Sequence, residues 1–135
     1  MARTYFSKKV TVTAGYHIVT GFAEDSFVSI EETGDGVQSV AGADGEVARS
    51  ISADPRCTVK ISLLQTSASN DYFMRRYKMD KTDGNGSFPL LIKDLTGGQI
   101  FSADEAWVVK KPPFSRGKAV GNCEWEICAV GEFED

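Results

Sequence analysis

Lysine and arginine are absent from a long early part of the sequence, between Val10 and Ala48. The acidic residues of that part are Glu24, Asp25, Glu31, Glu32, Asp35, Asp44 and Glu46. Basic residues cluster later, in Arg75–Lys81 and Lys110–Lys118, and the net charge is −4. An acidic chain of this kind lacks the basic groove that nucleic-acid binders use. The pattern fits either an ordinary solvated surface or a two-signed surface that mates with copies of itself or lines an acidic passage.

Imidazole and thiol groups are also scarce. The sequence has one histidine, His17, and three cysteines, an odd number that argues against a secreted disulfide framework. Cys123 and Cys128 fall in one predicted strand, on opposite faces and about 16 Å apart, so they can neither bridge nor share a metal. We therefore expect no metal site and no cofactor, and we expect the thiols to be buried and reduced.

Long apolar runs are missing, and we expect no signal peptide. No segment approaches the roughly 18 apolar residues of a membrane helix, and the basic N-terminus is not followed by an apolar stretch. Hydrophobic residues make up 41% and charged residues 25% of the chain, as in an ordinary globular domain. We expect a single domain, 1–135, with no membrane association, located in a cytoplasm or in a particle assembled there.

The sequence reads as short strands separated by Gly, Asp and Asn, with one helix. The helix is predicted at Ser67–Asp80, with Ser67 or Ser69 as N-cap, and the Asp83-Gly-Asn-Gly86 turn ends it. These elements predict a mainly β fold, a β-sandwich or open β-barrel with one α-helix packed on the outside. The predicted strands are Lys8–Ala14, His17–Phe22, Phe27–Glu32, Val37–Ala41, Val47–Ile51, Cys57–Leu64, Phe88–Asp94, Trp107–Lys111 and Asn122–Val130.

The alternation of apolar and polar residues defines a core. Apolar residues alternate with polar ones from Thr58 to Leu63, and an apolar stripe of Ala68, Tyr72, Phe73 and Tyr77 follows one side of the helix. Arg75 and Lys78 point away from this stripe. We predict that one cluster buries Val59, Ile61, Leu63, Phe73, Tyr77, Leu91 and Trp125.

Few residues of the sequence match the motifs of known catalytic sites. Nucleophilic catalysis would need His17 as base, but no Gly-x-Ser-x-Gly turn occurs, so a surface or strand-edge histidine is expected. Glu124 and Glu126 flank Trp125 on one strand face, which allows a glycosidase-like pair or a sugar platform. An outward polar face opposite a buried Trp125 explains the same residues more simply. A monomeric carbohydrate-binding β-sandwich, using Trp107 or Trp125, stays as the alternative.

Several segments, in order, resemble the tail tube proteins of contractile-tailed bacteriophages. The resemblance extends over about Val10 to Val130. The segments are Val40-Ala-Gly-Ala-Asp-Gly45, Arg49-Ser50, Thr58–Asn70, Ala106–Pro112 and Glu124-Trp125-Glu126.

This resemblance implies a structural protein without enzymatic activity, similar in fold to the tubes of R-type pyocins and type VI secretion systems. It implies hexameric rings that stack into a hollow tube inside a contractile sheath. The implied partners are further copies of the chain, the tail sheath protein, and baseplate and tail terminator proteins. Phage DNA would pass through the lumen without specific binding. The implied location is the tail of the virion, after assembly in the host cytoplasm.

If the chain forms such a tube, the alternation of its residues assigns roles to particular side chains. Ser29 and Glu31 share one strand face and are expected to face the lumen, where an acidic lining repels DNA. The alternative is that Glu31 only solvates an outer strand face. Glu24, Asp25 and Asp35, in the flanking turns, are expected to add to the lining or to meet the next ring. Arg75 and Lys78 are expected to face the sheath.

Overall fold

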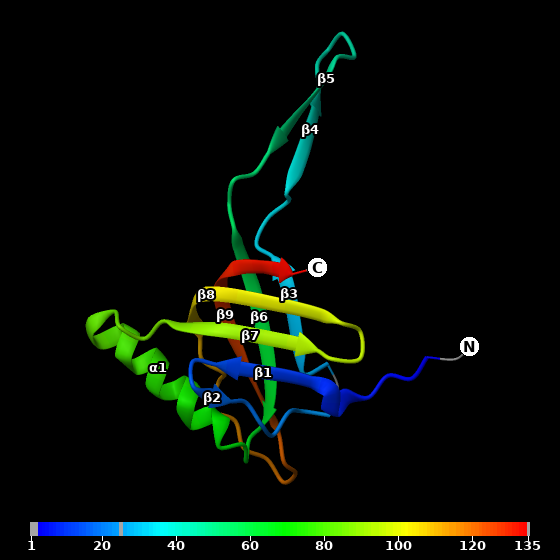
Figure 1. Ribbon diagram of the computed structural model, residues 1–135. Coiled ribbons are helices and arrows are strands. Elements are labelled where there is room, and N and C mark those ends of the chain that lie inside the picture. The colour runs from blue at the N-terminus through cyan, green and yellow to red at the C-terminus, as the bar shows by residue number, and fades with distance from the viewer. Residues whose placement is uncertain (1–2, 25, 135) are drawn as a thin grey trace.

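The computed structural model describes residues 3–24 and 26–134 (Figure 1). Across these residues the chain forms a short 3-10 helix η1 (Ser7–Lys9), nine strands and one α-helix, α1 (Ser69–Asp83). The mainly β fold with one helix is confirmed. The strands are β1 (Val10–Ala14), β2 (His17–Ile18), β3 (Val28–Glu32), β4 (Val37–Ala41), β5 (Val47–Ile51), β6 (Arg56–Leu64), β7 (Phe88–Asp94), β8 (Gln99–Lys110) and β9 (Asn122–Glu134).

Seven strands form one bent antiparallel sheet in the order β2-β1-β7-β8-β9-β6-β3. Strands β1, β7 and β8 run across the direction of β3 and β6, so the sheet folds over itself (Figure 1). The pairing of β8 with β9 shifts register between Ala103 and Glu105 and again between Val108 and Lys110. Such irregularities increase the local bend and twist. The sheet does not close into a barrel, because β2 and β3 remain its edges.

Alternate side chains of the sheet point into a single core. Val59, Ile61 and Leu63 of β6 are fully buried, and Trp125 and Phe73 join them, as predicted. Tyr77 packs only at the margin of this cluster. The prediction for Leu91 was wrong. Within β7, buried positions alternate from Phe88 through Leu90 to Ile92, so Leu91 falls on the other face.

Helix α1 packs its apolar side against the core while its other side is exposed. The Phe73 ring lies 5.7 Å from that of Trp125, between centroids, and Arg75 and Lys78 are exposed as expected. The start was mispredicted: Ala68, which is exposed, occupies the N-cap without any side-chain cap bond. The end was predicted correctly in kind, since Gly84 adopts the left-handed conformation (φ 76°) that terminates helices.

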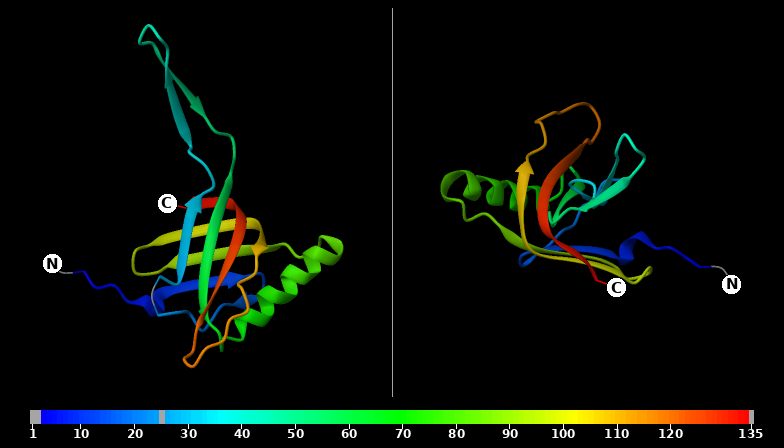
Figure 2. Two further views of the ribbon diagram at one scale, coloured as in Figure 1. Left: turned by 180° about the vertical axis from the view of Figure 1, so that it is seen from behind. Right: turned by 90° about the horizontal axis from the view of Figure 1, so that it is seen from above.

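Strands β4 and β5 form a separate two-stranded hairpin that stands away from the bent sheet (Figures 1 and 2). Their bounds match the prediction. Every residue from 31 to 56 is exposed. The exposed fractions of the largest apolar side chains are Val37 55%, Val40 68%, Val47 64% and Ile51 78%. This hairpin therefore lacks the packing that stabilises the rest of the chain, and a hairpin without such packing is only marginally stable in water.

A short neck joins the hairpin to the body. The backbone N–H of Thr33 donates to the carbonyl of Arg56 (3.2 Å), and that of Ser52 donates to the carbonyl of Gly36 (2.8 Å). The Arg56 guanidinium also holds Asp54 at 2.7 Å, and its hydrogen bonds lower the pKa of Asp54 to about 2. The pair therefore keeps its charges down to strongly acidic pH.

Truncation of the core should destabilise the fold strongly. We expect Leu63→Ala and Phe73→Ala each to lower the free energy of unfolding by about 2–5 kcal/mol, because each leaves a cavity among fully buried neighbours. Urea denaturation would measure the loss. Leu95→Ala, at a residue that is 57% exposed, is the matched control and should change stability by no more than about 0.5 kcal/mol. Equal midpoints for all three variants would contradict the proposed core.

Candidate functional site

His17 and Ser69 form the pair that most resembles catalytic machinery. The Nε2 atom of His17 lies 2.8 Å from the hydroxyl of Ser69, and the ring stacks on Tyr72 at 4.6 Å between centroids. Ser69 is fully buried, and its hydroxyl also accepts the backbone N–H of Thr20 at 3.0 Å. A nucleophile must be reached by its substrate, and this hydroxyl is enclosed. The pair instead fastens the edge strand β2 to the start of α1.

The carboxylates beside Trp125 do not build a sugar platform. Trp125 is buried, and its indole Nε1 donates to the side chain of Asn70 at 2.9 Å. Glu124 and Glu126 point to the opposite face, where Glu126 lies across from Lys60 of β6. Trp125 is therefore a core residue, and the carbohydrate-binding alternative based on it is wrong. The other tryptophan, Trp107, is half-buried at the rim of a shallow cleft.

Potential metal ligands do not gather at one place in the described part of the chain. Across 3–24 and 26–134, no group of three His, Cys, Asp or Glu side chains is placed to hold a metal. The three thiols are free; Cys57 is buried as expected, whereas Cys123 and Cys128 are only half-buried. Burial raises the pKa of Cys57 and of Cys128, which favours the protonated thiol. In the same part of the chain, α1 is too short and too polar to cross a membrane.

The residues expected at the lumen share one exposed face of β3. Ser29 and Glu31 are exposed, while Val28 and Ile30 are half-buried against the core, which is the predicted alternation. The register sets Ser29 opposite Lys60 of β6. Sequence reasoning missed this lysine, because the pairing of β3 with β6 is not visible in the sequence. The face is therefore mixed in charge at that point.

The other acids predicted at the lumen are spread over two places. Glu24 is exposed and lines the same cleft as Ser29. Asp35 lies at the neck of the hairpin, in a shallow pocket with Gln38 and Ser50. Asp25 lies outside the described residues.

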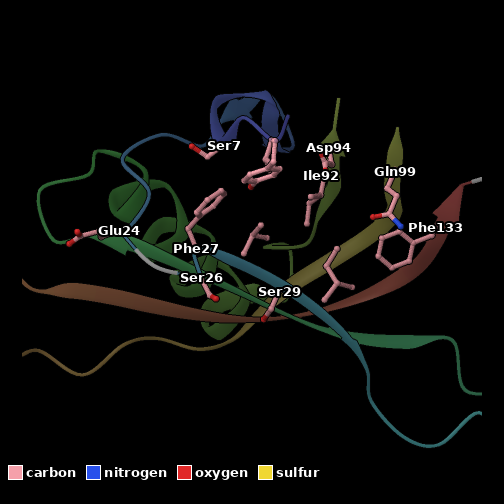
Figure 3. A pocket seen from close by; sticks show the side chains of 13 residues that line it. Ser7, Glu24, Ser26, Phe27, Ser29, Ile92, Asp94, Gln99 and Phe133 are labelled. Atoms are coloured by element: carbon pink, nitrogen blue, oxygen red, sulfur yellow. The ribbon is translucent and has the colours of Figure 1, made fainter. Parts of the chain in front are cut away.

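A cleft of about 780 Å³, here the seam cleft, separates edge strand β3 from the other half of the bent sheet. Phe27, Ile92 and Phe133 line it from three different segments (Figure 3). Val28 and Ile30 add apolar side chains from β3, and Glu24 and Asp94 lie at its boundary. The seam cleft is thus an opening of mixed apolar and polar lining directly beside an unpaired strand edge.

A second cleft, the terminal cleft, has a volume of about 920 Å³ and lies where β6 ends and α1 begins. Its apolar lining includes Met74, Pro113, Phe114 and part of Trp125. Its cationic residues are Lys110, Lys111 and Arg116, all exposed. The loop after β8 supplies most of this basic rim, which sequence reasoning described only as a basic cluster.

Comparison with known families identifies the group of proteins to which the chain belongs. Residues 7–133 match the family model described as "Bacteriophage PhiTE tail tube protein". The chain belongs to this family of phage tail tube proteins. The predicted resemblance to phage tail tubes is thereby confirmed. As a member of this family, the chain is a structural protein of a phage tail.

One curated relative and two solved structures are similar to this tail tube family member. It is 32% identical over 132 residues to "Structural protein ORF10" of Pseudomonas phage KPP10, covering 92% of this chain and 76% of the relative. Its fold is similar to the tube-terminating cap of the anti-feeding prophage (TM-score 0.59, 9% identity, 99% of this chain and 93% of that chain). It is also similar to the sheath/tube terminator of the extracellular contractile injection system PVC in the extended state (TM-score 0.54, 10% identity, 93% of each chain).

Removing the Ser69 hydroxyl should loosen β2. We expect Ser69→Ala to lower the free energy of unfolding by about 1–3 kcal/mol, because the Thr20 N–H and the His17 ring lose their buried partner. Thermal unfolding and hydrogen exchange at β2 would measure the effect. Ser115→Ala, at an exposed loop serine, is the control and should leave both unchanged. If both variants exchange alike at β2, the pair does not hold this strand.

Proposed function

We propose that the chain is the repeating subunit of an inner tail tube, in which six copies form a ring and rings stack into a hollow tube for the phage genome. The observation that carries this proposal is the β4–β5 hairpin. It presents four large apolar side chains that no other part of the described chain covers. A structural subunit explains this, because neighbouring copies bury surface that a monomer would leave in water.

The open sheet suits lateral association within a ring. Strands β2 and β3 are edges of the same sheet, and unpaired edges invite pairing with another chain. The seam cleft places apolar side chains directly beside the β3 edge. In the proposed ring, each copy covers the free edge of β3 and the apolar part of the seam cleft of its neighbour, which removes both from water.

The exposed face of β3 is our candidate for the lumen wall. Ser29 and Glu31 share this face, and Glu24 lies near it across the seam cleft. A wall that carries carboxylates repels the DNA backbone and lets it slide, whereas a basic wall would retain it through phosphate contacts. We include Asp25 with this group, and we assign Asp35 to contacts between rings because it lies at the neck of the hairpin.

The outer wall is assigned to α1. Arg75 and Lys78 are exposed on the side of the helix that faces away from the core, where acidic groups of the sheath can meet them. Baseplate and tail terminator proteins bind the two ends of the tube in this scheme. The subunit belongs to the tail of the virion and is assembled in the host cytoplasm.

A tube terminator is the second candidate, because both structural neighbours are named as caps or terminators. Negative-stain imaging of concentrated protein separates the two. A tube subunit stacks into tubes of variable length, whereas a terminator gives single rings. Monodisperse globules at every concentration would sink both candidates.

Reversal of one charge should test the lumen assignment. In Glu31→Lys particles, six repelling charges per ring become six attracting ones, so we expect normal assembly but slow, salt-dependent DNA ejection. Ejection kinetics at low and high salt would measure this. Asp83→Lys, at the end of α1, makes the same charge change away from β3 and should eject normally. Kinetics identical to the parent's at low salt would remove Glu31 from the passage.

Reversal of two charges should test the outer wall. We expect Arg75→Glu combined with Lys78→Glu to spare tube formation and to weaken sheath assembly, because both side chains project away from the core. Arg75→Gln alone is the control and should be tolerated, since single surface charge pairs contribute about 0–1 kcal/mol. Electron microscopy would count sheathed tails. Normal sheathing in the double variant would rule out this contact.

A further inference from the structure

The connection between α1 and β7 contains an asparagine followed directly by a glycine, Asn85-Gly86 (Figure 1). An asparagine in this position reacts readily with the backbone that follows it, because glycine has no side chain to shield its nitrogen. The Asn85 side chain is exposed, so water reaches it, whereas Gly86 is buried. By its sequence and exposure, position 85 is therefore a site of spontaneous deamidation.

Deamidation needs the backbone nitrogen of Gly86 as its nucleophile. This nitrogen loses its proton to solvent and attacks the side-chain carbonyl carbon of Asn85, and the new C–N bond closes a cyclic imide. The C–N bond of the side-chain amide then breaks, and its nitrogen takes up a proton and leaves as ammonia. Water opens the imide at either carbonyl, which leaves an aspartate or an isoaspartate at position 85. The net reaction consumes water and releases ammonia, and nothing is oxidised or reduced.

In the folded chain this nitrogen already has a partner. The N–H of Gly86 donates to the side-chain carboxylate of Asp80, in the last turns of α1, at 2.9 Å. The attack requires a nitrogen that has lost its proton, and loss of the proton here would place two negative charges in contact. A like charge at such a distance disfavours the ionised form, so Asp80 keeps the proton on Gly86.

The surroundings of the turn also hold its backbone in place. A Cβ atom at Gly86 would collide with the backbone carbonyl of Arg76, so the chain is packed closely against α1 at this point. On the other side, the N–H of Asn85 donates to the Asp83 carboxylate at 3.0 Å. Because the backbone is held on both sides of Asn85, the rotation that brings its side-chain carbon to the Gly86 nitrogen is opposed.

We propose that Asn85 is a latent deamidation site and that Asp80 protects it for as long as the end of α1 stays folded. Helix ends open locally more often than the core, and the reaction proceeds during such openings. The product adds a carboxylate near Asp80 and Asp83, at the helix end where the dipole disfavours negative charge. An isoaspartate also inserts an extra carbon into the backbone, which moves Gly86 away from Asp80. A modified turn therefore cannot return to its original closure.

Peptide mapping by mass spectrometry, on protein stored at mildly alkaline pH, measures the reaction at position 85. We expect folded Asp80→Ala to deamidate there about tenfold or more faster than the parent, because Gly86 loses its charged partner. Asp80→Asn keeps an acceptor of similar shape without the charge, and its rate should lie between the two. Asp71→Ala removes an acid from the other end of α1 and should react at the parent's rate. In urea all four chains should react alike, because no fold remains to protect the turn.

The comparison of folded and denatured chains makes the test decisive even if Asp80→Ala fails to fold. A parent chain that deamidates at position 85 as fast when folded as in urea would overturn the protection. Folded Asp80→Asn that reacts no faster than the parent would overturn the role of the Asp80 charge. The Asn85→Ser variant lacks the reacting amide and should show no change at this position. A reaction at Asn70 or Asn122 in place of Asn85 would show that the latent site lies elsewhere and that the proposal is wrong.

Discussion

The register between β6 and β9 is the constraint on which the rest of the molecule depends. It runs from Arg56 opposite Val130 to Leu64 opposite Asn122 and sets Val59 and Ile61 across from Ile127 and Trp125. A slip of one residue would turn every one of these side chains to the other face. The hairpin and the terminal cleft lie at the two ends of β6, so the packing that fixes this register also fixes where both of them lie.

The sequence contained enough to predict most strands, because β6 alternates cleanly and the hairpin strands are bounded by turn residues. It failed where the local pattern was ambiguous. Leu90 and Leu91 are equally apolar, so alternation alone did not show which one faces the core. The start of α1 was misplaced because the Ser69 hydroxyl bonds His17 and Thr20 of a distant segment instead of capping the helix.

The functional surfaces were less predictable than the fold. The exposed face of β3 followed from alternation, but its neighbour Lys60 depended on strand pairing. The bounds of β4 and β5 were correct, yet nothing in them showed that the two strands pair only with each other. The terminal cleft is built from the end of β6, α1, the loop after β8 and the start of β9, which only folding brings together. The family was visible because several motifs occur in order along the chain.

The neck has a mechanical consequence for any stack held together by these hairpins. Each joint would pass through two short segments tied by two backbone hydrogen bonds and the exposed pair of Arg56 and Asp54. Exposed pairs of this kind resist deformation weakly, whereas the packed sheet resists it strongly. Bending of a long filament would then be taken up at the joints, and its persistence length would be set by a few neck residues while each disc stays rigid.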